Sequence, residues 1–219
     1  MYDHLLHLWG PQKWWPAQTP LEVVIGAYLT QSTSWKSVER SLANLDTRGL
    51  LSQGKQSVEA LHAIPEDELR ALIRPSGYMT RKAASIKAFI AFLIRDYDGS
   101  LEALAGEPAA IAREKLLALP GIGPETADAI LLYALGQPAM VVDEYLRRVV
   151  TRHKLLPEGA KYPAIQSLAA ASFDSDPPGK RLEHYNEFHA LIVEVGKRHC
   201  GPKPVCADCP LFRDLNAER

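Results

Sequence analysis

The sequence predicts an all-α protein, and three observations carry this prediction. Apolar residues recur at helical spacing over most of the 219 residues, whereas the alternating pattern of a β-strand is almost absent. Serine, threonine, proline and acidic residues stand where helices would begin. With 47% apolar residues, the chain can bury a sizeable core as one compact protein of one or two lobes.

The expected helices can be placed in order from their start signals and apolar stripes. Thr19-Pro-Leu-Glu22 is a capping box with proline at the first helical position. Ser34 can cap the next helix, acidic residues follow Pro65 in the first turn of another, and Pro75-Ser-Gly77 forms a turn. The expected helices span residues 21–29, 35–45, 65–73, 81–97, 111–119, 124–136, 144–153, 162–173 and 182–198.

The most informative stretch is a tight Gly-x-Gly turn between two of these helices, at Leu119-Pro-Gly-Ile-Gly123. Pro120 cannot continue the first helix, and Gly121 and Gly123 permit positive φ. Pro124 suits the first position of the second helix. The backbone N–H groups left over would face outward, where they and the helix dipole favour a phosphate oxygen. Taken alone, the turn is more typical of an ordinary corner between two helices.

Several motifs together resemble the endonuclease III superfamily of DNA glycosylases, which carries a helix-hairpin-helix followed by a Gly/Pro-Asp segment. They are Leu119-Pro-Gly-Ile-Gly123 with Thr126-Ala127, Val141-Val-Asp143, Gly26-Ala-Tyr-Leu-Thr-Gln-Ser-Thr33, Arg74-Pro-Ser-Gly-Tyr-Met-Thr-Arg-Lys-Ala83 and a C-terminal cysteine group. The resemblance implies a two-lobed helical fold. One lobe, residues 20–133, carries the hairpin at about 111–133, and the second combines residues 1–19 with 134–219. The active site would lie between the lobes.

By this resemblance Asp143 is the catalytic carboxylate. Cleavage of an N-glycosidic bond builds positive charge on the deoxyribose, which a fixed carboxylate stabilises, or the carboxylate activates an attacking water. The alternative is that Asp143 caps the helix that begins at Glu144, and both roles are compatible. At Glu125, bifunctional members present a lysine that forms a Schiff base. Glutamate has no amine, so the resemblance implies a monofunctional enzyme that leaves the abasic site intact.

The base pocket is expected around Trp14-Trp15-Pro16, with Glu125 and Tyr145. Electron-poor alkylated purines gain from an aromatic face, although packing is the alternative role of the indoles. These residues resemble the small 3-methyladenine glycosylases of the superfamily, which also carry glutamate where the lyases carry lysine. The chain departs from them near Leu191, which stands where those members have a lysine.

Contacts with DNA are expected from a local patch, because the net charge is −1. Gln31 resembles the wedge glutamine that fills the gap left by a flipped base, and the alternative is an exposed residue at a helix end. Lys82 and Arg147 are candidate phosphate contacts, or else ordinary surface residues. The hairpin residues expected to contact DNA are Leu119, Gly121, Ile122, Gly123 and Thr126. The resemblance also implies a monovalent cation at the hairpin.

All three cysteines lie within ten residues, in the pattern Cys200-x5-Cys206-x2-Cys209, which favours a metal or cluster site. Family members with a [4Fe-4S] cluster carry a fourth cysteine at the position that is Leu215 here. A cluster with three cysteine ligands is the expectation, with His199, Asp208 or Asp214 as fourth-ligand candidates. Zinc on three thiolates and His199, or three free thiols, are the alternatives.

Three functions stay open at this point. The first is a monofunctional glycosylase for an alkylated purine such as 3-methyladenine. The second is a glycosylase for mismatched or oxidised pyrimidines with weak lyase activity, and the third is a silent DNA-binding hairpin protein. The chain lacks an 18-residue apolar run and a signal-peptide pattern, so we expect a cytoplasmic, nucleoid-associated monomer acting on double-stranded DNA.

Overall fold

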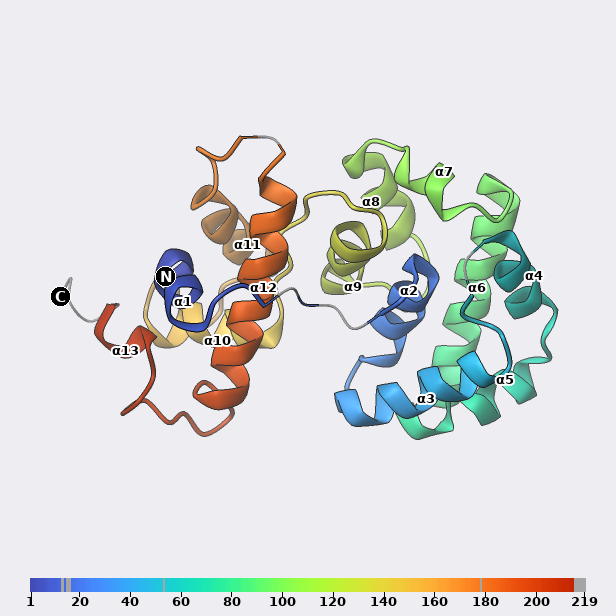
Figure 1. Ribbon diagram of the computed structural model, residues 1–219, viewed down its shortest axis with the longest axis horizontal. Coiled ribbons are helices and arrows are strands. Elements are labelled where there is room, and N and C mark those ends of the chain that lie inside the picture. The colour runs from blue at the N-terminus through green and yellow to red at the C-terminus, as the bar shows by residue number, and fades with distance from the viewer. Residues whose placement is uncertain (13, 15–16, 53, 178, 215–219) are drawn as a thin grey trace. The chain divides into compact units, whose positions relative to one another are not determined.

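The computed structural model describes residues 1–12, 14, 17–52, 54–177 and 179–214, and all regular elements among them are helical (Figure 1). In chain order they are α1 (Tyr2–Trp9), α2 (Pro20–Leu29), α3 (Trp35–Thr47), α4 (Lys55–Ala63), α5 (Glu66–Leu72), the 3-10 turn η1 (Arg74–Ser76), α6 (Met79–Tyr97), α7 (Leu101–Ala105), α8 (Ala109–Leu117), α9 (Pro124–Ala129), the π-helical turn η2 (Ile130–Ala134), α10 (Glu144–Arg152), α11 (Tyr162–Ala171), α12 (Arg181–Arg198) and α13 (Leu211–Asp214). The all-α prediction is confirmed for this part of the chain.

The chain forms two compact units, Pro16–Gln137 and Met1–Trp15 with Pro138–Arg219. In the first unit, α2 is apolar almost throughout and packs against α3, α6 and η2. Half of the expected capping box is present, because the Thr19 side chain accepts a hydrogen bond from the Glu22 amide at 3.1 Å, while the Glu22 carboxylate accepts one from the Gln18 amide at 2.8 Å. The hairpin helices α8 and α9 belong to this unit.

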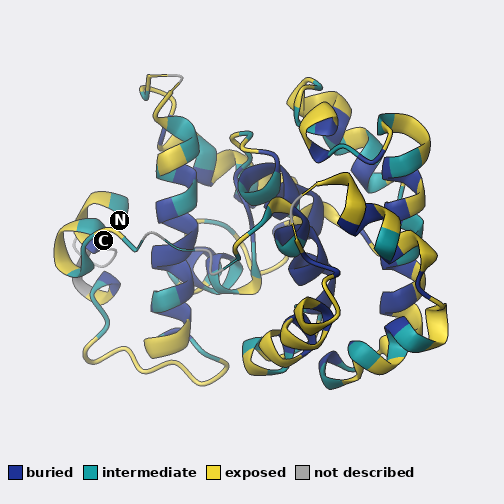
Figure 2. Ribbon diagram, turned by 45° about the vertical axis from the view of Figure 1, so that its right-hand side comes forward, coloured by how far each residue is buried: buried dark blue, intermediate teal, exposed yellow. Residues whose placement is uncertain are grey.

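The second unit is built around α12, which packs against α1 and α10. Every residue from Glu187 to Val193 is buried, so this part of α12 is covered on all sides (Figure 2). Two of these buried residues are polar, Glu187 and His189. Buried polar side chains need partners. Glu187 accepts a hydrogen bond from the Gln12 amide, and His189 Nε2 lies 3.6 Å from Asp143 Oδ2.

Among the described residues, four short helices were not expected from the sequence: α1, α4, α7 and α13. Each has nine residues or fewer, so its apolar stripe is too short to stand out as periodicity. The helix expected over 124–136 instead changes to π-helical geometry at Ile130. A search of the described helices found none long and apolar enough to cross a membrane.

Candidate functional site

The hairpin turn joins α8 to α9 and depends on Gly121. This residue has φ 78°, which an L side chain rarely adopts. A Cβ here would also lie 2.5 Å from Ser85 Oγ and 3.0 Å from Ser85 Cβ on α6. Gly121 therefore lets the turn close tightly against the body of its unit.

Gly123 differs from the expectation of positive φ. It is extended, with φ −98° and ψ 178°, and serves as the N-cap of α9, with Pro124 in the first turn. An added Cβ would meet no atom within 4 Å. The backbone at Gly123 is consequently open to approach from outside, at the helix end where the dipole favours an anion.

Gln31, just after α2, holds the hairpin from its own unit. Its Nε2 donates to the Gly121 carbonyl at 2.7 Å and to Thr126 Oγ1 at 3.2 Å. Thr126 and Ile122 are buried, whereas Leu119 is half-buried and Gly121 exposed. The contacts of these four residues with DNA stay a prediction. The monovalent cation expected at the hairpin stays a prediction.

Glu125 lies in the first turn of α9 and is exposed. A carboxylate in the first turn of a helix is stabilised by the helix dipole. It offers no nucleophilic amine, and this holds for its side chain whatever its surroundings.

Asp143 precedes α10 and is fixed from several directions. Its Oδ1 accepts a hydrogen bond from the Leu146 amide at 2.7 Å, so the expected N-cap role is present. The segment before it is anchored to α11, because the Val142 amide donates to the Tyr162 hydroxyl at 3.2 Å and Gln166 Nε2 donates to the Met140 carbonyl at 2.8 Å. The Asp143 side chain is only 11% exposed.

The second carboxylate oxygen of Asp143 faces a histidine that sequence reasoning missed. His189 Nε2 lies 3.6 Å from Asp143 Oδ2, and the edge of the same imidazole meets Trp14 with ring centroids 5.5 Å apart. Lys197 Nζ lies 5.9 Å from the centre of the Trp14 ring. Asp143 and Trp14 are thus brought together through His189, whereas Trp15 and Pro16 lie outside the described residues.

Tyr145 packs on α12 at Gly196. A Cβ on Gly196 would lie 1.9 Å from Tyr145 Cδ1, so only glycine admits the ring there. Arg148 lies on the Tyr145 ring, with its Cζ 5.8 Å from the ring centre. Arg147 is half-exposed and donates to the Ala160 carbonyl at 2.8 Å. Tyr145 therefore contacts Gly196 and Arg148, and its role toward a base stays a prediction.

Lys82 corrects a sequence prediction. It was a candidate phosphate contact or else an ordinary surface lysine, but it is 1% exposed and its ammonium donates to the Leu29 carbonyl, the Ser76 carbonyl and Thr33 Oγ1, each at 2.8 Å. Burial lowers the pKa of Lys82 to about 8, and the nearby Arg81 charge adds to this shift. An ammonium with its donors engaged in the interior ties three segments together and has no access to DNA.

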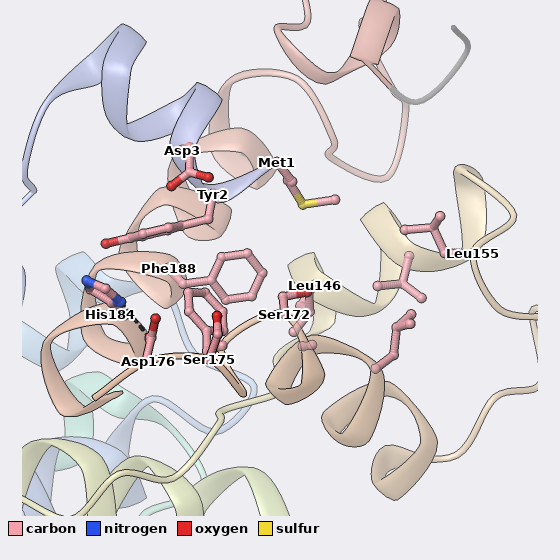
Figure 3. A pocket seen from close by; sticks show the side chains of 14 residues that line it. Met1, Tyr2, Asp3, Leu146, Leu155, Ser172, Ser175, Asp176, His184 and Phe188 are labelled. Carbon is pink, nitrogen blue, oxygen red and sulfur yellow. Dashed lines mark hydrogen bonds and ion pairs between the residues drawn. The ribbon is translucent and has the colours of Figure 1, made fainter. Parts of the chain in front are cut away.

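A cavity of about 370 Å³ opens in the second unit, next to α1, α10 and α12 (Figure 3). Its wall includes Leu146, Phe173 and Phe188, and at one end His184 Nδ1 lies 2.6 Å from Asp176 Oδ2. None of the predicted site residues that the structure describes lines it. This cavity is therefore separate from the cluster of Asp143, His189 and Trp14.

The cysteines do not fit the expected cluster. Cys200 is buried and accepts from Arg152 Nη1 at 3.2 Å, Cys209 is half-buried and Cys206 is exposed. Within the described ranges, no three His, Cys, Asp or Glu side chains gather as metal ligands. Burial raises the pKa of the Cys209 thiol, and the charges of Cys200 and Cys206 add to this shift.

The candidate fourth ligands do not complete such a site. His199 stacks on Trp9 with ring centroids 6.4 Å apart, and no described residue gives its buried Nδ1 a hydrogen-bond partner. Asp208 is exposed, while the Asp214 side chain and Leu215 lie outside the described part. Arg152 holds this segment instead, donating to the Gly201 carbonyl at 2.7 Å and the Pro202 carbonyl at 3.2 Å.

Comparison with known proteins places this arrangement in a family. Residues 25–173 match the profile of the HhH-GPD superfamily base excision DNA repair proteins. A DNA repair glycosylase candidate of Methanocaldococcus jannaschii is 43% identical over 212 residues, covering 96% of this chain and 92% of the relative. The crystal structure of the H. pylori 3-methyladenine DNA glycosylase MagIII bound to 1,N6-ethenoadenine is similar, with 31% identity, a TM-score of 0.75, and coverage of 90% of this chain and 95% of that one.

A trapped covalent intermediate of endonuclease III with DNA shares the fold, with 23% identity, a TM-score of 0.75, and coverage of 96% of this chain and 90% of that one. The family match covers well over half of the sequence and includes the hairpin, the turn at Gly121 and the Asp143 segment. The chain is a DNA glycosylase that belongs to the HhH-GPD superfamily of base excision DNA repair proteins.

Proposed function

We propose that this glycosylase is monofunctional and releases an alkylated purine, such as 3-methyladenine, from double-stranded DNA. Two features of the chain carry the proposal. Asp143 is a carboxylate held in place by the Leu146 amide, and position 125 holds a glutamate and not a lysine. The likeness to the H. pylori 3-methyladenine glycosylase, at 31% identity, supports the choice of base.

DNA would be gripped at the hairpin by its backbone. The open backbone at Gly123 and the N-terminal end of α9 suit a phosphate oxygen, which positions the duplex without reading its sequence. Gln31 is the residue proposed to fill the gap left by the flipped nucleotide. Since its amide bonds Gly121 and Thr126 here, insertion into DNA would require it to exchange these partners for the orphaned base.

The proposed chemistry is hydrolysis. As the bond between deoxyribose C1′ and the base nitrogen breaks, its electron pair leaves with the base and positive charge develops on the sugar. The Asp143 carboxylate stabilises this charge, and the oxygen of a water forms the new bond to C1′ while Asp143 takes a water proton. The products are the free base and an intact abasic strand.

Asp143 is suited to this task by its surroundings. Oδ1 is held by the Leu146 amide, so Oδ2 is the oxygen available to the sugar or the water. A low exposed fraction keeps the carboxylate out of bulk water, where its charge would act more weakly. Trp14, in contact with His189, would form one wall beside the flipped base, and the charge of an alkylated purine favours an aromatic face.

Glu125 decides the outcome after base release. An amine at this position could attack C1′, form a Schiff base and lead to strand scission, whereas a carboxylate cannot. The reaction would therefore stop at the abasic site.

Base release from a panel of duplexes tests the proposal. The panel holds single 7-methylguanine, 1,N6-ethenoadenine, hypoxanthine or G·T sites, together with methylated DNA as the source of 3-methyladenine. We expect free alkylpurine and a strand that breaks only after alkali. Thymine release or breakage without alkali would favour the pyrimidine-directed enzyme, and binding without release would favour a silent hairpin protein.

A further inference from the structure

We infer that His189 is a positioning residue for Asp143, and this inference rests on the catalytic role proposed for that carboxylate. His189 lies in the fully buried part of α12 and is 7% exposed. Its Nε2 is 3.6 Å from Asp143 Oδ2. A buried imidazole that faces a nearly buried carboxylate requires an explanation beyond the packing of an apolar helix.

The carboxylate is held unequally at its two oxygens. Oδ1 receives a short hydrogen bond from the Leu146 amide at 2.7 Å, while Oδ2 faces His189 Nε2 at 3.6 Å, longer than a hydrogen bond. Catalytic hydrogen bonds are often long in the free enzyme and tighten when substrate binds. Closure of this distance would fix the carboxylate plane through an Nε2–H donor, with Oδ2 still able to accept a second bond.

His189 is itself fixed by the chain segment that leads to the tryptophans. The Gln12 amide donates to Glu187 Oε2 at 2.6 Å, one half-turn before His189 on α12. Trp14 then meets the His189 ring edge-on, at an interplanar angle of 80°. One imidazole therefore contacts both the carboxylate and a proposed wall of the base pocket, so it can hold the two in register.

The charged groups around this cluster come from two elements, the start of α10 and α12. Asp143 faces His189 from the start of α10, Glu187 and Lys197 belong to α12, and Lys197 lies over the Trp14 ring. An imidazole with Nε2–H needs no net charge to donate to Asp143. The proposed positioning therefore works with the neutral ring, and the charges of Glu187 and Lys197 are not required for it.

Two substitutions separate positioning from packing. His189→Phe keeps a ring against Trp14 but removes the hydrogen-bond donor. His189→Gln loses the ring but can place an amide N–H close to the position of Nε2. A positioning role predicts that Gln supports catalysis better than Phe. A packing role predicts the reverse order.

The experiment measures single-turnover base release, with enzyme in excess over a duplex carrying one 1,N6-ethenoadenine or the base that the panel identifies. We expect H189F to lower the rate by about 100-fold, because misplacement by about 1 Å costs that much. Duplex affinity should stay within about twofold, and H189Q should regain most of the rate. D143N/H189F should be no slower than D143N.

The matched control is His184→Phe, the same substitution on α12 at a histidine that faces Asp176 and the cavity of Figure 3. It should leave the rate unchanged. If H189F strongly lowers the melting temperature, H189N takes its place in the comparison. Asn is too short to bring its amide to the Nε2 position, so H189Q should then release the base faster than H189N.

A wild-type rate for H189F, or a faster rate for H189F than for H189Q, would overturn the inference. Failure of the proposed function is separately visible, because D143N would then release the base as fast as wild type whatever stands at position 189.

Discussion

Arg113 and Asp128 join the two helices of the hairpin through a bidentate ion pair. Arg113 Nε donates to Oδ1 at 2.6 Å and Nη2 to Oδ2 at 3.0 Å. The Asp128 side chain is 1% exposed, and that of Arg113 is 32% exposed. Two parallel N–H···O bonds fix orientation as well as distance, so this pair sets the angle between α8 and α9.

Breaking the pair should be costly. Arg113→Ala leaves the Asp128 charge buried without its main partner, and we expect the free energy of unfolding in urea to fall by about 3–5 kcal/mol. Replacing both residues with apolar ones, as R113M/D128L, should recover most of this loss. A change below about 0.5 kcal/mol in R113A would mean that the pair does not hold the hairpin.

The two glycines of the turn should respond differently to alanine. Gly121→Ala places a methyl group against Ser85 at positive φ, and we expect a loss of about 2 kcal/mol or more in unfolding free energy. At Gly123 an added methyl group has space and the φ angle suits any residue, so the unfolding free energy of G123A should equal that of wild type.

The same two variants test the phosphate contact. G123A should weaken duplex binding several-fold in a titration at fixed salt, because the added methyl group stands where a phosphate oxygen would approach. Equal duplex affinities for G123A and wild type would place the DNA backbone elsewhere.

Lys82 should make stability depend on pH. Burial lowers the pKa of Lys82 to about 8, whereas a lysine in the unfolded chain has a pKa of about 10.4. Between these two pH values the unfolded state binds more protons than the folded state. Stability contributed by this group therefore rises as pH increases through that window.

Lys82→Met provides the comparison. It leaves two carbonyls and a hydroxyl without their donor, so we expect a loss of about 3 kcal/mol at pH 7.5. From pH 7.5 to 9.5, the unfolding free energy of wild type should rise relative to that of K82M. Parallel pH curves for the two proteins would show that the Lys82 pKa is not lowered by burial.

Glu125→Lys should add lyase chemistry to the enzyme. An amine in the first turn of α9 would attack the sugar carbon, so borohydride should trap a covalent complex with lesion-containing DNA. Glu125→Gln is the matched control and should give no trapped complex. Trapping of wild type at the level of E125K would contradict the monofunctional proposal.

The helical class and most long helices followed from the sequence because their apolar stripes and caps are local signals. Asp143 was expected as both cap and carboxylate, and the cap is present. Lys82 was misplaced, because a lysine in an amphipathic helix looks the same whether its ammonium meets water or three internal acceptors.

The tertiary partners could not be read from spacing. Arg113 and Asp128 are 15 residues apart on different helices, and His189 and Asp143 are farther apart still. A signal did exist: Asp128 stands between alanines in an apolar run, and His189 follows Phe188 in another. A polar residue inside an apolar helix needs a buried partner, although sequence does not identify it.

Single-turnover base release by Asp143→Asn tests whether the Asp143 carboxylate drives cleavage of the glycosidic bond. Asparagine keeps the shape and the capping oxygen but removes the negative charge, so folding and duplex binding should persist. We expect the release rate of the base identified by the panel to fall by at least about 100-fold. Release by D143N at the wild-type rate would show that the Asp143 carboxylate does not drive the reaction.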